Sequence, residues 1–141
     1  MNQALRERLH TLYAALKLGQ LDFILNAFDE EIEFISYSPV KIFPFLGHRR
    51  GKPAVAEALR GAHAEFEFLT CEPVAMVLEA EQAAVQIFTR VVNRLTGRPV
   101  QVLLAHFLRF RDGKIVEVRE FMDSYRAAEQ VLGRELVPAA D

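Results

Sequence analysis

Four long segments in the second half of the sequence alternate between apolar and polar residues and are separated by very short breaks. The segments are residues 65–79, 82–95, 99–111 and 114–122. This two-residue repeat is typical of β-strands that bury one face. The breaks are Glu79-Ala80-Glu81, Thr96-Gly97 and Asp112-Gly113. Connections this short join only antiparallel neighbours, so the sequence predicts a meander of four antiparallel strands.

The first half is organised differently. Leucines recur at helical spacing over residues 3–18, and Gly19 follows them. A second short helix is expected just after it, then a strand over 31–37, a loop over 38–51 and a third helix from Pro53. A last helix is expected over 124–132. Helices followed by a meander predict a single α+β domain spanning residues 1–141, with helices covering one face of a curved antiparallel sheet.

Composition excludes several classes of protein. The net charge is −2, which is not the basic balance of a generic nucleic-acid-binding protein. The single cysteine, Cys71, excludes an internal disulfide and a cysteine-based metal site. The start of the chain has no apolar stretch typical of a signal peptide, and no apolar run approaches the ~20 residues that span a bilayer. We therefore expect a cytoplasmic protein that binds neither nucleic acid nor membrane. No motif predicts a metal site or a cofactor.

Alternation assigns inward and outward faces to the last three strands. The inward sets are apolar except for Thr89, His106 and Glu120. A three-residue turn at 111–113 would place Leu104 opposite Glu120, and a two-residue turn at Thr96-Gly97 would place Thr89 beside Leu104. His106 and Glu120 would then be diagonal neighbours, about 7–8 Å apart at the backbone. The three polar residues should form one cluster on an apolar wall.

Glu120 is the informative member of this cluster. An ionised carboxylate on an apolar wall is costly unless it is paired or held in its neutral form. A carboxyl group beside a histidine in an apolar pocket is suited to proton transfer. The alternative is a structural pair in which His106 only satisfies Glu120. A one-residue slip in register would move Glu120 to the solvent side and remove both interpretations.

The whole chain resembles the nuclear-transport-factor-2-like superfamily, and within it the SnoaL-like polyketide cyclases and the ketosteroid isomerases. The segments that carry the resemblance are Leu12-Tyr13-Ala14-Ala15-Leu16, Gly19-Gln20-Leu21-Asp22, Ala27-Phe28-Asp29-Glu30-Glu31-Ile32-Glu33-Phe34, Phe110-Arg111-Asp112-Gly113-Lys114-Ile115 and Arg119-Glu120-Phe121-Met122-Asp123. The resemblance implies a cone-shaped sheet around helices, open at one end to an apolar pocket. It also implies a homodimer through the outer sheet face, where Leu103, Ala105, Phe107 and Phe121 would form an apolar strip.

The family's functional residues carry over unevenly. The acid/base aspartate and the histidine of SnoaL-like cyclases correspond to Glu120 and His106. The general base of ketosteroid isomerases corresponds to Ser36, which disfavours steroid chemistry. Epoxide hydrolases of this fold need an arginine and an aspartate at Ile87 and Thr89, so that reaction is also disfavoured.

From these observations we expect an isomerase or cyclase that acts on a small apolar carbonyl compound without a cofactor. Glu120 would remove a proton and His106 would orient it or donate a hydrogen bond. Expected substrate-binding residues are Thr89, Tyr37, Phe34, Phe43, Phe45, Val118, Met122, Leu104 and Tyr13. Two alternatives have the same fold: a non-catalytic protein that binds a small molecule, and a dimeric interaction protein whose pocket is filled.

Overall fold

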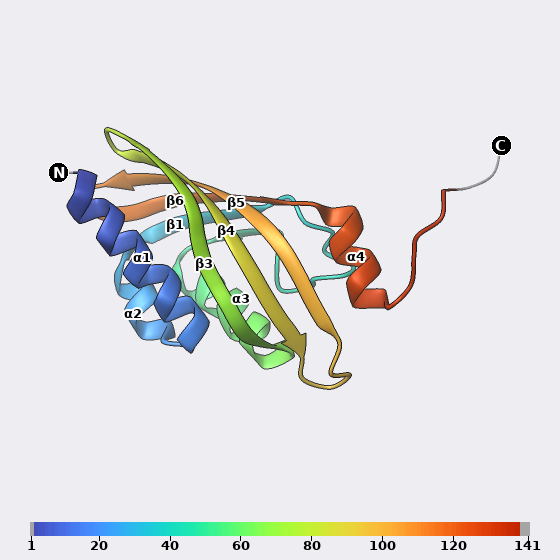
Figure 1. The fold of residues 1–141 in the computed structure, drawn as a ribbon. Helices are drawn as coiled ribbons and strands as arrows, with labels where there is room; N and C mark the ends of the chain where they lie inside the picture. Colours follow the sequence, from blue (N-terminus) through green and yellow to red (C-terminus); the bar gives the residue numbers. More distant parts are fainter. Residues whose placement is uncertain (1, 139–141) are drawn as a thin grey trace.

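A computed structural model describes residues 2–138 and contains four helices and six strands (Figure 1). In chain order these are α1 (Asn2–Leu18), α2 (Leu21–Asn26), β1 (Phe28–Ser36), β2 (His48–Arg50), α3 (Lys52–Glu65), β3 (Phe66–Glu79), β4 (Gln82–Asn93), β5 (Pro99–Arg111), β6 (Lys114–Met122) and α4 (Ser124–Leu132). The predicted helices and strands are confirmed to within a few residues. The Asp123 carboxylate accepts a hydrogen bond from the Arg126 amide at the start of α4, and left-handed Gly133 ends that helix.

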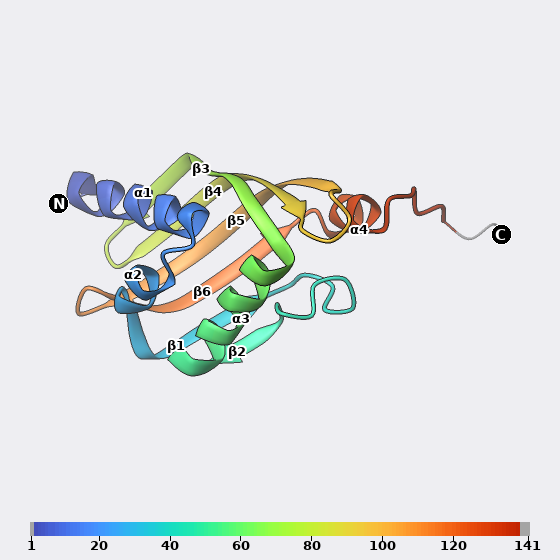
Figure 2. The same ribbon diagram turned by 90° about the horizontal axis from the view of Figure 1, so that it is seen from below.

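The six strands form one open, curved sheet in the order β2-β1-β6-β5-β4-β3. The meander β3 to β6 is antiparallel as predicted, whereas β1 lies parallel to β6. Helices α1, α2 and α3 lie against one face of the sheet, and α4 lies beyond the ends of the strands (Figure 2). This arrangement is the predicted α+β fold. No helix within residues 2–138 combines the length and the apolar character that crossing a bilayer requires.

The β5–β6 hairpin corrects the predicted register. Its turn has two residues, Asp112 and Gly113, both with positive φ, and Arg111 pairs with Lys114. A β-bulge then leaves Val116 as an extra residue on β6. Glu120 consequently lies opposite His106 rather than Leu104. The shift is two residues, so Glu120 still faces inward. The bulge turns Ile115 into the core as well, although strict alternation counted back from Glu120 would place Ile115 on the outer face.

The β4–β5 connection is also longer than predicted. Four residues, 94–97, separate Asn93 from Arg98, and the Asn93 side-chain oxygen accepts hydrogen bonds from two amides within this loop. The longer loop places Thr89 opposite Val102. Thr89 is therefore four residues along β4 from Val85, the residue opposite His106. At about 3.3 Å per residue this is roughly 13 Å of strand, so the prediction of one compact cluster of three polar residues is wrong.

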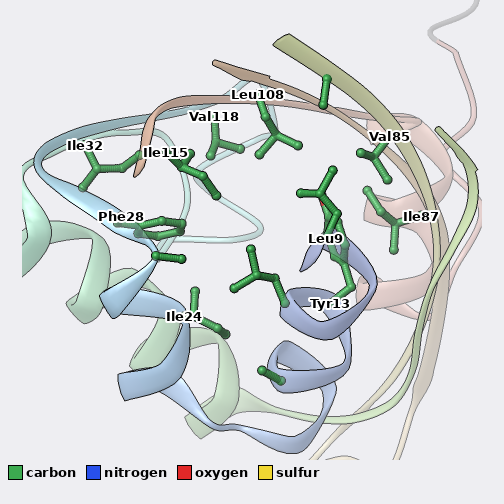
Figure 3. Close-up of a cluster of buried hydrophobic side chains, with 14 of the residues drawn as sticks. Leu9, Tyr13, Ile24, Phe28, Ile32, Val85, Ile87, Leu108, Ile115 and Val118 are labelled. Atoms are coloured by element: carbon green, nitrogen blue, oxygen red, sulfur yellow. The ribbon is translucent and has the colours of Figure 1, made fainter. Parts of the chain in front are cut away.

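The core lies between the helices and the concave side of the sheet. Side chains from α1, α2, β1, β4, β5 and β6 point toward one another there, as Figure 3 shows for Leu9, Tyr13, Ile24, Ile87 and Val118 among others. A second cluster around Phe43, Phe66 and Val100 joins the 38–47 loop to the ends of β3, β4 and β5. The two clusters meet along the same concave wall, where the candidate site is found.

Candidate active site

An apolar cavity of about 190 Å³ lies inside the concave face of the sheet, between α1, α3 and the 38–47 loop. Ten of the eleven predicted site residues line it: Tyr13, Phe34, Phe43, Phe45, Thr89, Leu104, His106, Val118, Glu120 and Met122. The lining contains no lysine or arginine. The cavity is therefore suited to a small, mostly apolar molecule without a negative charge.

His106 and Glu120 form a buried, hydrogen-bonded pair on the cavity wall. They lie directly opposite each other on β5 and β6, and His106 Nε2 is 2.8 Å from Glu120 Oε2. His106 is 7% exposed and Glu120 is 6% exposed. The contact is closer than the predicted diagonal because the shorter turn and the bulge at Val116 each shift the register by one residue, which together bring the two residues into the same cross-strand position.

Three hydroxyl groups extend this pair into a chain of five side chains. The Tyr13 hydroxyl is 2.7 Å from His106 Nδ1, and Ser36 Oγ donates a hydrogen bond of 2.9 Å to Glu120 Oε1. Ser38 Oγ lies 2.8 Å from Ser36 Oγ. The two serines were not among the predicted site residues. For Ser36 the sequence did carry a signal, because the resemblance to ketosteroid isomerases places their general base at this position. Its contact with Glu120 comes from the parallel pairing of β1 with β6.

Counting protons in this chain favours one arrangement. With Glu120 ionised and His106 neutral, Tyr13 donates to Nδ1, Nε2–H donates to Glu120, and Ser36 donates to the other carboxylate oxygen. Every donor then has an acceptor, and the carboxylate accepts at both oxygens. Burial raises the pKa of the Tyr13 hydroxyl well above its usual 10.0, and the neighbouring Cys71 and Glu120 raise it further. Tyr13 is therefore a neutral donor.

Thr89 stands apart from this chain on the same wall. Its side chain lines the cavity and is buried, and its hydroxyl makes no hydrogen bond to a nitrogen or oxygen atom. Cys71 lies across the strand pair from it. Burial, opposed in part by the Thr89 hydroxyl, raises the pKa of the Cys71 thiol to about 12, so the thiol is neutral and a weak hydrogen-bonding group.

Tyr37 is the one predicted site residue that does not line the cavity. It follows the inward-facing Ser36, so its side chain lies on the outer face and is 52% exposed. Its hydroxyl accepts a hydrogen bond of 2.7 Å from Arg119, and its ring stacks on Phe121. The expectation that Tyr37 binds substrate is therefore corrected, because Tyr37 directly follows the last residue of β1 and continues its alternation onto the outer face.

The chemical capacity of the site follows from these contacts. A carboxylate held at both oxygens in an apolar cavity can accept a proton from a bound molecule, and the histidine beside it has both ring nitrogens engaged, which fixes its orientation. Within residues 2–138, no group of three or more histidine, cysteine, aspartate or glutamate side chains is placed to hold a metal ion.

Comparison with known proteins identifies one matching family and several solved structures of similar fold. Residues 9–118 match the SnoaL-like domain family. A candidate isomerase from Rhodopseudomonas palustris has a TM-score of 0.80 at 30% identity, covering 87% of this chain and 91% of that chain. A nuclear-transport-factor-2-like protein from Burkholderia xenovorans LB400 has a TM-score of 0.72 at 26% identity, covering 85% of this chain and 89% of that chain. An LEH-like epoxide hydrolase from M. tuberculosis has a TM-score of 0.73 at 16% identity, covering 94% of this chain and 92% of that chain. No curated protein matches the sequence.

Proposed function

This chain belongs to the SnoaL-like domain family, and from that premise we propose that it is an isomerase or cyclase that moves a proton on a small apolar carbonyl compound. The observation that carries the proposal is the Glu120 carboxylate, which is fixed at both oxygens on the wall of an apolar cavity. Such a group is oriented before any ligand arrives and works in surroundings that strengthen electrostatic interactions.

In the proposed step, Glu120 takes a proton from the carbon next to the carbonyl group. A bond forms between that proton and a carboxylate oxygen, and the electron pair left behind makes an enolate whose charge resides mainly on the ligand oxygen. Where a carbon–carbon double bond is conjugated with the enolate, return of the proton to the far carbon of that system gives an isomer. The site needs no oxidant or reductant for this exchange, because the same proton is taken and returned.

His106 has a supporting role in this scheme. Its two ring nitrogens bind Tyr13 and Glu120, so the imidazole holds the carboxylate in place. Ser36 does the same from the other oxygen. Tyr13 is a neutral hydroxyl in the cavity lining, and it can release its hydrogen bond to His106 and donate to a developing oxyanion instead.

Proton exchange on simple ketones tests this proposal without knowledge of the natural substrate. Acetophenone and 2-indanone are incubated with the protein in D₂O, and loss of the proton signals next to the carbonyl is followed by NMR. The wild-type protein should accelerate exchange, and Glu120→Gln should abolish the acceleration while preserving the melting temperature. Glu117→Gln is the matched control, because Glu117 lies on the same strand and hydrogen-bonds Arg119 outside the cavity.

A second candidate function is binding without catalysis. It is favoured by one specific observation: the Tyr13–His106–Glu120–Ser36–Ser38 chain satisfies its own hydrogen bonds, as a purely structural network would. The two candidates separate in the exchange experiment. If ketones bind and neither the wild-type protein nor any variant accelerates exchange, the cavity is a binding site only, and the proposed proton transfer is wrong.

We further propose that the outer sheet face pairs with a second copy of this chain. The Tyr37 ring stacks on Phe121 there, Phe107 meets Phe121 edge-on, and Phe107 is 51% exposed. Glu117 and Arg119 lie beside these rings as an ion pair, so the face presents both signs of charge. A face of this kind is complementary to its own copy related by a two-fold axis.

A further inference from the structure

Two buried side-chain atoms within the described residues have no hydrogen-bond partner, Thr89 Oγ1 and His63 Nε2. The His63 ring stacks on Phe68 and is absent from the cavity lining. Thr89 does line the cavity, and the residue is 4% exposed. An unpartnered hydroxyl on a cavity wall is the kind of group that a ligand satisfies.

The surrounding sheet offers this hydroxyl only one weak partner, the thiol of Cys71. Thr89 lies on β4, an internal strand that pairs with β3 on one side and with β5 on the other. The neighbouring Cys71 is a neutral thiol and bonds weakly. A valine would fill the same shape without a buried polar atom, so the hydroxyl is costly to the free protein.

The cavity sets the class of ligand. Its volume of about 190 Å³ is only somewhat larger than an apolar cavity of ~150 Å³ that holds benzene. This is room for one ring with a few substituents. The lining contains no lysine or arginine and includes Glu120, so an anionic ligand would meet repulsion and no counter-charge.

We propose that Thr89 is a ligand-binding residue whose hydroxyl donates a hydrogen bond to the oxygen of a neutral, single-ring ketone. This inference rests on the proposed use of the cavity for a carbonyl compound, but it concerns a binding orientation in which the carbonyl group lies at Thr89 and away from Glu120, so it does not depend on catalysis by Glu120. Thr89 is separated from the residue opposite His106 by about 13 Å of strand, so it marks a second polar point on an otherwise apolar wall. It therefore sets which way the ring lies.

The test compares acetophenone with α-methylstyrene, in which a CH₂ group replaces the carbonyl oxygen at nearly the same shape. Affinities are measured by calorimetry or by NMR titration. The wild-type protein should bind acetophenone about tenfold more tightly, the value of one hydrogen bond. Thr89→Val should remove this preference while binding α-methylstyrene at least as well as the wild type. Thr89→Ser, which keeps the hydroxyl, should retain the preference for acetophenone.

Two further measurements separate ligand binding from a structural role. Thr89→Val should raise the melting temperature of the free protein, because it removes an unpartnered polar group from the interior. Thr70→Val is the matched control: Thr70 lies on the neighbouring strand outside the cavity lining, and its substitution should leave the preference unchanged.

Three results would overturn the inference. The first is an undiminished preference for acetophenone in Thr89→Val, and the second is a fall in the melting temperature of that variant without ligand. The third is failure of both probes to bind the wild-type protein. If none of the proteins accelerates proton exchange but the preference for acetophenone still depends on the Thr89 hydroxyl, only the proposed catalysis is refuted.

Discussion

Replacing His106 with leucine should destabilise the protein more than replacing both members of the His106–Glu120 pair. In His106→Leu, the Glu120 carboxylate loses its contact at Oε2, and the Tyr13 hydroxyl loses its acceptor. Both groups stay buried in an apolar wall. Removing one partner of a buried pair costs about 3–5 kcal/mol, because it leaves an uncompensated charge.

The other variants follow from the same contacts. Glu120→Leu leaves two neutral donors, on His106 and Ser36, for which we expect a cost of about 1–3 kcal/mol. The double variant contains no buried charge, so it should be more stable than His106→Leu alone. For a domain of this length a loss of about 4 kcal/mol corresponds to a fall of roughly 13 °C in melting temperature.

Urea unfolding of the four proteins measures these differences, with the slope m checked for constancy. The matched control is Arg109 and Glu117, which face each other on the same two strands but lie nearer solvent, with Arg109 half exposed. The same cycle of leucine substitutions there should give a coupling below about 1 kcal/mol. The reasoning is refuted if His106→Leu costs less than 1 kcal/mol, or if adding Glu120→Leu lowers its stability further.

Three further predictions concern groups outside the cavity lining. Phe107→Asp on the outer face should shift sedimentation from dimer to monomer, and an unchanged dimer would contradict the proposed interface. Hydrogen bonding to Arg119 lowers the pKa of Glu117 below its usual 4.5. The Glu117 carboxylate therefore contributes to stability above pH 4.5, and this contribution is lost as the pH falls below 4.5. In urea unfolding, the stability difference between wild type and Glu117→Gln should shrink over that range. Burial raises the pKa of Cys71 to about 12, so Ellman's reagent should label it at pH 8 only after denaturant is added, and rapid labelling of the native protein would contradict its burial.

Most of the fold could be predicted from local sequence patterns. Alternating residues identified the long strands, and leucine spacing with Gly19 identified α1. The inward placement of His106, Thr89 and Glu120 was also predicted, because it depends only on odd or even position along a strand. The error in register left this conclusion intact, since the shift was two residues.

The contacts of the site could not be predicted in the same way. The bulge at Val116 and the four-residue loop after Asn93 decide which residues lie opposite each other, and both add residues that a two-residue repeat does not count. The bulge, together with a turn one residue shorter than predicted, brought Glu120 onto His106, and the loop moved Thr89 away from them.

Ser36 illustrates what only tertiary structure decides. It hydrogen-bonds Glu120 across 84 residues of sequence, through a parallel pairing of β1 with β6 that no turn or spacing encodes. Tyr13 reaches His106 from a helix across 93 residues in the same way. The sequence by itself determined which side chains enter the interior, because periodicity is a local property of the backbone. Which of them touch was decided by the packing of distant elements, because hydrogen bonds depend on distances that only the assembled sheet and helices define.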